Sequence, residues 1–104
     1  MGYKVLHIGV PTVTIRPNEE YVEAMKLYKV DPKHSEFNLE YIRFQDGTPF
    51  PEVMHTNPHI AIEVDCIEEA SKGTQVIVKP IELTDCIICF IVKDGVIFEL
   101  TQMK

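Results

Sequence analysis

The chain has 104 residues, a usual length for one domain. Hydrophobic residues make up 45% and charged residues 25%, which is typical of a folded globular protein and excludes a disordered chain. Acidic residues outnumber basic ones by 16 to 10, giving a formal net charge of −6. An acidic domain without a Lys/Arg cluster is poorly suited to nucleic acid or to an anionic membrane surface.

The compartment is predicted from the start of the chain and from its cysteines. No basic segment followed by an apolar one opens the sequence, so a signal peptide is not expected. The longest apolar run, Cys86 to Val92, is far below the roughly 20 residues that span a bilayer. Cys86 and Cys89 form a C-x-x-C, but residues three apart on a strand point to opposite faces and do not chelate one metal. We therefore expect a cytoplasmic protein.

In the first half, residues 3–10 alternate and predict a strand, followed by a loop over 11–17. Asn18 is a suitable N-cap for a helix that ends at Asp31-Pro32. The apolar stripe of this expected helix consists of Tyr21, Ala24, Met25 and Tyr28. A second strand is expected over 36–44, and the Gly- and Pro-containing stretch 45–58 predicts a linker.

The second half predicts the order β-α-β-β-β. A strand over 59–64 precedes a short helix that Asp65 caps, with Glu68 as capping-box partner and Gly73 at its end. Strands are expected over 74–79, 86–93 and 96–102, and Asp94-Gly95 predicts a tight hairpin between the last two.

The two halves resemble each other at their first and last strands. Leu6-His7-Ile8-Gly9-Val10 matches Pro58-His59-Ile60-Ala61-Ile62, and Leu39-Glu40-Tyr41 matches Phe98-Glu99-Leu100. The two histidines are 52 residues apart (59 − 7), half the length of the chain. An internal repeat of this kind can decide the fold.

Alternation within these strands predicts a sheet with two different faces. One face is uniformly apolar, as a packed helix requires, and the other carries the His and Glu residues beside a pocket. Two imidazoles and two carboxylates on rigid strands suit a divalent ion such as Zn, Ni, Fe, Mn or Co. Such an ion would polarise a substrate oxygen, and a carboxylate would serve as the base. Without a metal, these side chains are ordinary hydrogen-bonded or solvent-facing residues.

These motifs resemble the vicinal oxygen chelate superfamily. It includes lactoylglutathione lyases of the glyoxalase type, extradiol dioxygenases, epimerases, and bleomycin and fosfomycin resistance proteins. The resemblance implies an α+β fold of paired βαβββ modules that form a curved mixed sheet or cup. By position it implies metal ligands at His7, Glu40, His59 and Glu99, with Glu99 and Glu40 also as catalytic groups.

The first module is expected to be shortened. Its His and Glu are 33 positions apart (40 − 7), against 40 in the second module (99 − 59), so one or two strands are predicted to be missing. Glu40 is for that reason the least secure ligand. Within one glyoxalase-like domain, 1–104, we expect a first module at 1–44, a linker at 45–58 and a second module at 59–104. A shortened module also predicts a homodimer.

The leading functional prediction is a small-molecule enzyme of the glyoxalase-like type, acting as a divalent-metal-assisted lyase, isomerase or dioxygenase. The alternative is a non-catalytic resistance or sensing protein that binds a small molecule without metal, and a third possibility is an interaction domain. Glu63 shares a face with His59 and is a candidate supporting residue or base. His34 and His55 are expected to be ordinary surface residues of loops.

Overall fold

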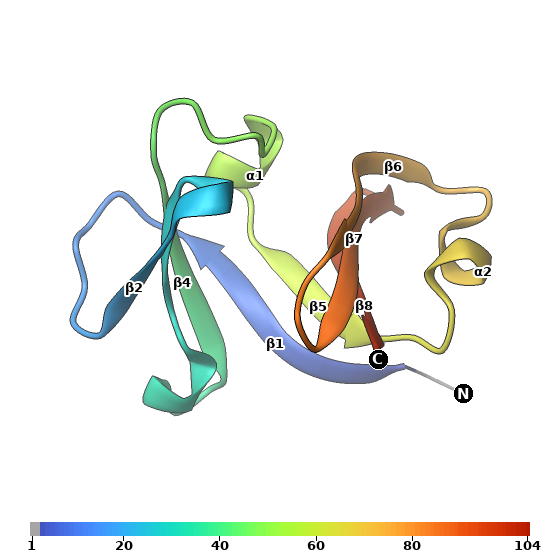
Figure 1. Cartoon of the computed structure of the whole chain (residues 1–104), viewed down its shortest axis with the longest axis horizontal. Coiled ribbons are helices and arrows are strands. Elements are labelled where there is room, and N and C mark those ends of the chain that lie inside the picture. Colours follow the sequence, from blue (N-terminus) through green and yellow to red (C-terminus); the bar gives the residue numbers. More distant parts are fainter. Residues whose placement is uncertain (1–2) are drawn as a thin grey trace. The chain divides into compact units, whose positions relative to one another are not determined.

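The computed structural model describes residues 3–104 of this chain. These residues form a small α+β protein with eight strands and two short α-helices (Figure 1). Pairing between strands is mixed, parallel and antiparallel, so the predicted fold class is confirmed. The elements in chain order are β1 (Lys4–Pro11), β2 (Glu19–Val22), η1 (Glu23–Met25), β3 (Leu27–Val30), η2 (Pro32–His34), β4 (Leu39–Phe44), α1 (Val53–Thr56), β5 (His59–Glu63), α2 (Ile67–Ser71), β6 (Gln75–Glu82), β7 (Cys86–Lys93) and β8 (Val96–Met103).

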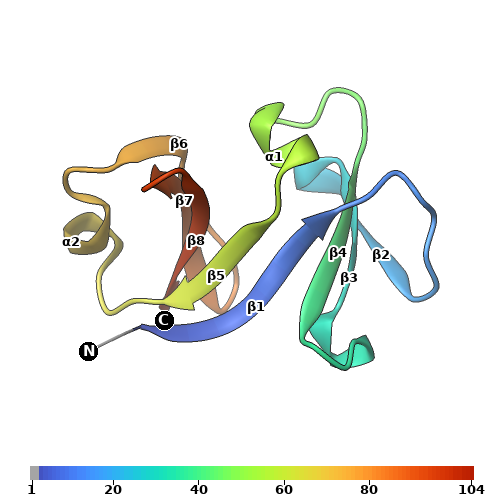
Figure 2. The same cartoon turned by 180° about the vertical axis from the view of Figure 1, so that it is seen from behind.

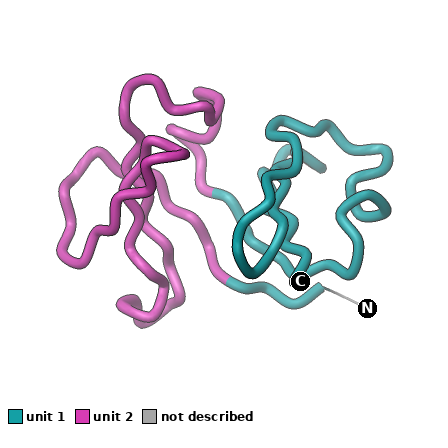
Figure 3. Tube along the Cα trace, in the orientation of Figure 1, with its two compact units in different colours: residues 1–6, 59–104 teal, residues 7–58 magenta. Residues whose placement is uncertain are grey.

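The chain divides into two compact units (Figure 3). Among the described residues, unit 1 contains 3–6 and 59–104, and unit 2 contains 7–58. Each unit holds one of the two repeated patterns, and each is described by itself.

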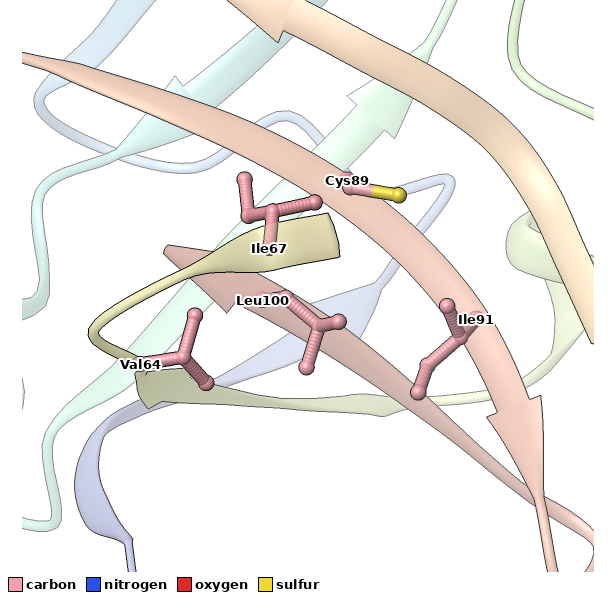
Figure 4. Close-up of a cluster of buried hydrophobic side chains, with 5 residues drawn as sticks. All are labelled: Val64, Ile67, Cys89, Ile91 and Leu100. Atoms are coloured by element: carbon pink, nitrogen blue, oxygen red, sulfur yellow. The ribbon is translucent and has the colours of Figure 1, made fainter. Parts of the chain in front are cut away.

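Unit 1 has the strand order β5-β8-β7-β6. β5 runs parallel to β8, whereas β7 pairs antiparallel with both β8 and β6. Helix α2 covers one face of this sheet, where its Ile67 packs into a buried cluster (Figure 4). The other members of that cluster are Val64, Cys89, Ile91 and Leu100. The apolar face predicted beneath a helix is therefore confirmed in this unit.

The start of α2 differs from the prediction. Its N-cap is Cys66, which makes no side-chain capping bond, and the N–H of Ile67 donates to Oε1 of Gln102 at 2.9 Å. The expected capping by Asp65 is thus wrong, because an amide from β8 already satisfies the first turn. The predicted Asp94-Gly95 hairpin is confirmed: both residues have positive φ, 54° and 78°, as the favoured two-residue turn requires.

Unit 2 has the strand order β2-β3-β4-β1 (Figure 2). β1 runs parallel to β4, and β3 is antiparallel to both β4 and β2. Three strands therefore follow the first one, as in unit 1, and the expectation of missing strands is wrong. The described part of unit 2 instead has no helix between its first and second strands.

The helix expected after Asn18 is wrong, since this segment forms the hairpin of β2 and β3. Its aromatic and β-branched residues favour strands. Tyr21 and Tyr28, seven positions apart, meet across the hairpin with ring centroids 4.8 Å apart. On a helix, residues seven positions apart also lie on the same face, so the spacing of these two tyrosines alone does not distinguish a helix from a hairpin. Asn18 and Lys26 adopt left-handed φ values of 67° and 50°, which a helix does not accommodate.

Residues 45–58 are more ordered than a simple linker. They contain helix α1, and both Phe50 and Met54 are buried. The ring of His55 stacks on Phe44 at 4.3 Å, and its Nε2 lies 3.1 Å from the carbonyl oxygen of Phe50. His55 is therefore a packing residue, and the expectation of an ordinary surface histidine is wrong. No helix among residues 3–104 has the length and apolar composition needed to cross a membrane.

Candidate metal-binding residues

In unit 2, His7 and Glu40 form a close pair on two adjacent parallel strands. His7 lies on β1 and Glu40 on β4, where Gly9 is the direct neighbour of Glu40. Nε2 of His7 is 3.3 Å from Oε1 of Glu40, and the two side chains are 16% and 13% exposed. Both groups are thus largely removed from water.

In unit 1, His59 and Glu99 form the corresponding pair. His59 lies on β5 and Glu99 on the parallel strand β8, where Ala61 is the direct neighbour of Glu99. Nε2 of His59 is 3.2 Å from Oε1 of Glu99, and the side chains are 2% and 11% exposed. The His59 ring also meets Phe90 edge-on, with centroids 5.3 Å apart, and this contact fixes the plane of the ring.

The two pairs have the same construction. In each, the histidine stands two residues before a small residue, Gly9 or Ala61, that lies beside the glutamate. Residues two apart on a strand share a face, so histidine and glutamate project from the same side of the sheet. The small residue between them leaves room for both side chains, and Ala61 is completely buried. Glu40 therefore occupies the position in its unit that Glu99 occupies in the other.

Each pair has suitable chemistry for a divalent metal ion. Imidazole nitrogen and carboxylate oxygen bind such ions at about 2.0–2.2 Å, so two neighbouring ligand atoms on one ion lie roughly 3.0–3.4 Å apart. The observed separations of 3.3 Å and 3.2 Å fall within this range. Both pairs consist of side chain types that can hold a metal ion.

The remaining candidate residues lie elsewhere. Glu63 is on the same face of β5 as His59, next to Thr101, and lines a surface cavity of about 410 Å³ with Tyr3, Lys4 and Asp65. His34 is exposed in η2. Among residues 3–104, no disulfide joins Cys66, Cys86 or Cys89, and Cys89 belongs to the core beneath α2. Sequence reasoning missed the spacing role of Gly9 and Ala61, although a small residue two positions after each histidine was its visible signal.

Comparison with known proteins identifies the fold. No family model matches the chain, and no curated protein matches it. Among solved structures, a hypothetical protein from Bacillus halodurans C-125 is similar with a TM-score of 0.64 and 18% identity, over 100% of this chain and 96% of that one. Methylmalonyl-CoA epimerase from Mycobacterium tuberculosis is similar with a TM-score of 0.54 and 15% identity, over 97% of this chain and 88% of that one.

Both similarities extend over nearly the whole of each chain, so they concern the complete fold and not one module. At 18% and 15% identity they show the fold alone.

Proposed function

We propose that this protein is a glyoxalase-like enzyme that uses a divalent metal ion, with His7, Glu40, His59 and Glu99 as candidate ligands, to act on a small oxygenated molecule. The reaction would belong to the lyase, isomerase or dioxygenase class. The observation that carries this proposal is the identical construction of the two His–Glu pairs, each on a parallel strand pair and each behind a small residue. The similarity in fold to an epimerase supports the enzyme class.

The donor set supports a 2+ ion. Two carboxylates neutralise the charge, and two neutral imidazoles suit Zn, Ni, Fe, Mn or Co more than Mg or Ca. Packing gives no equally good reason for a His–Glu pair in each unit, because glutamate is rarely buried unless it is paired or bound.

The chemistry of the proposed reaction depends on the glutamates. A bound divalent ion supplies Lewis-acid stabilisation of negative charge on a substrate oxygen. In an isomerisation, a carboxylate oxygen of Glu40 or Glu99 accepts the proton from a carbon beside a carbonyl, and the C–H electron pair moves towards the carbonyl oxygen. Return of that proton to carbon completes the reaction and restores the carboxylate. The rigid strands hold both carboxylates in place for this transfer.

Metal analysis of the purified protein tests the proposal. The protein is reconstituted separately with Zn, Ni, Fe, Mn and Co, desalted, and analysed for bound metal. We expect about one ion per chain in the wild type, and strong loss in both His7→Ala and His59→Ala. His34→Ala is the matched control, because His34 is exposed and belongs to neither pair. A wild type that retains none of the five metals would overturn the proposal.

The alternative is a metal-free protein that binds a small molecule for resistance or sensing. In that case the four side chains would serve as hydrogen-bonding groups for the ligand, and the metal analysis would show no retained ion. Circular dichroism of the wild type, His7→Ala and His59→Ala shows whether each protein is folded. If all three are folded and the wild type holds no metal, the absence of metal is not caused by unfolding, and the metal-free alternative is favoured.

We also propose that the protein is a cytoplasmic homodimer. No disulfide joins the cysteines of residues 3–104, which suits a reducing compartment. Within residues 3–104, unit 2 has no counterpart of α2 between its first two strands, and Ile8 and Tyr21, on the face opposite His7 and Glu40, are 37% and 45% exposed. Sedimentation velocity at micromolar concentration is expected to give twice the chain mass of 11.9 kDa, and a monomer would contradict the proposal.

A further inference from the structure

A lysine lies on the ligand face of unit 2, the sheet face that carries His7 and Glu40. Lys29 of β3 is the direct neighbour of Ile42 on β4, and Ile42 stands two residues after Glu40. Paired residues share a face, as do residues two apart on one strand. Lys29 and Glu40 therefore project from the same side of the sheet, and Lys29 is half-buried there.

The strand spacing places Lys29 within reach of a ligand beside Glu40. Adjacent strands lie about 4.8 Å apart and two residues along a strand span about 6.7 Å, so the Cα atoms of Lys29 and Glu40 are roughly 8 Å apart. The four-carbon stem of a lysine carries the ammonium about 6 Å from its Cα. The ammonium can thus contact a group a few bonds away from an atom bound at His7 and Glu40.

The acidic neighbours of Lys29 leave its ammonium available. Glu20 faces it across the hairpin and is exposed on the edge strand β2. Asp31 follows two residues later, and its carboxylate accepts the N–H of Lys33 at 2.9 Å, which is the main cause of its lowered pKa. The charge of Lys29 contributes less to this lowering than the Lys33 N–H does.

The repeat shows that packing does not require a charge at this position. In unit 1 the corresponding strand is β7, and Ile88 neighbours Thr101 as Lys29 neighbours Ile42. Ile88 is only 5% exposed. The same place in the module therefore accepts a buried aliphatic side chain, whereas unit 2 has a cation beside a proposed metal ligand.

We propose that Lys29 binds an oxyanion of the substrate, so that the substrate class is a small organic acid. One part of the molecule would reach the ion at His7 and Glu40 through its oxygens, and a carboxylate or phosphate a few bonds away would contact Lys29. This inference rests on the proposed function and adds the charge of the substrate. An ammonium–carboxylate contact of this kind is charge-assisted and stronger than a neutral hydrogen bond.

Two chelating probes that differ in one carboxylate test the inference. Acetohydroxamic acid binds a metal ion through two oxygens, and succinic acid monohydroxamate has the same chelating group with a remote carboxylate. Calorimetric titration of the Ni- or Co-loaded protein measures both affinities. We expect Lys29→Gln to weaken binding of the succinic probe about tenfold and to leave acetohydroxamate unchanged. Lys29→Arg should retain most of the affinity.

Lys33→Gln is the matched control, because Lys33 is exposed in η2 and lies outside the paired strand positions. It should change neither affinity. If Lys29→Gln weakens both probes equally, or neither, the inference is wrong while the metal-dependent function stands. If the wild type retains no metal, or binds neither hydroxamate, the proposed function is wrong and the inference fails with it.

Discussion

Replacing Gln102 with alanine should destabilise unit 1 by removing the acceptor at the start of helix α2. Oε1 of Gln102 takes the first-turn N–H of Ile67 at 2.9 Å, and Cys66 at the N-cap position provides no side-chain acceptor. Loss of a capping acceptor costs about 1 kcal/mol, within a range of roughly 0.5–2. For a domain of about 100 residues, each 1 kcal/mol lowers the melting temperature by roughly 4–8 °C.

Thermal and urea unfolding followed by circular dichroism measure this effect, with two comparison variants. Gln102→Glu keeps an oxygen at the same place and adds a negative charge near a helix N-terminus, so it should keep wild-type stability. Asp65→Ala should change stability by less than about 0.5 kcal/mol, because Asp65 is exposed and does not cap α2. A larger loss of stability in Asp65→Ala than in Gln102→Ala, or equal unfolding of both Gln102 variants, would contradict the capping role of Gln102.

Three further predictions concern other parts of the molecule. Lys26→Gly should stabilise the β2–β3 hairpin by about 0.5 kcal/mol in urea unfolding. The left-handed φ of 50° at Lys26 costs a non-glycine residue more free energy than glycine costs through its greater chain entropy in the unfolded state. If this segment were a helix, the same change would destabilise the protein by about 1 kcal/mol. Iodoacetamide should label the exposed Cys66 but not Cys89 in the native protein, because burial shields Cys89 and raises the pKa of its thiol; early labelling of Cys89 in peptide mass spectra would contradict this. The hydrogen bond from Arg43 lowers the pKa of Glu19 in the folded protein. This pair therefore stabilises the fold above the ordinary glutamate pKa of about 4.3, and the stabilisation is lost as pH falls through the lower pKa of the folded state. Arg43→Gln should flatten the acid side of a plot of melting temperature against pH, and an unchanged plot would contradict a stabilising role of the pair.

The second module could be predicted closely because several independent signals agreed there. A strand pattern from His59, a helix ending near Gly73 and the Asp94-Gly95 turn all indicated the order that the structure shows. The first module could not be predicted in this way, because the spacing of Tyr21 and Tyr28 fits both a helix and a β-hairpin. Tyr21 and Tyr28 share a helix face and also a cross-strand position, and the left-handed φ values of Asn18 and Lys26 distinguish the strand arrangement from the helix.

The His–Glu pairs within each unit were predictable from the repeat, since a histidine on the first strand and a glutamate on the last become neighbours whenever those strands pair in parallel. The doubt about Glu40 came from counting residues between His7 and Glu40. We took the shorter spacing to mean that strands were missing from the first module. The structure pairs Gly9 with Glu40 across a connection that contains the two strands β2 and β3.

The loop between Pro11 and Glu19 is where the two modules differ, and this gives the chain a natural insertion point. In unit 1 a helix occupies this connection, while in unit 2 a short loop with Val13 and Ile15 at 95% and 75% exposure joins the same two strands. Loop length costs little free energy, since each doubling adds only about 0.6 kcal/mol. A designed segment carrying a helix could therefore be grafted between residues 12 and 18 without altering the pairing of His7 with Glu40.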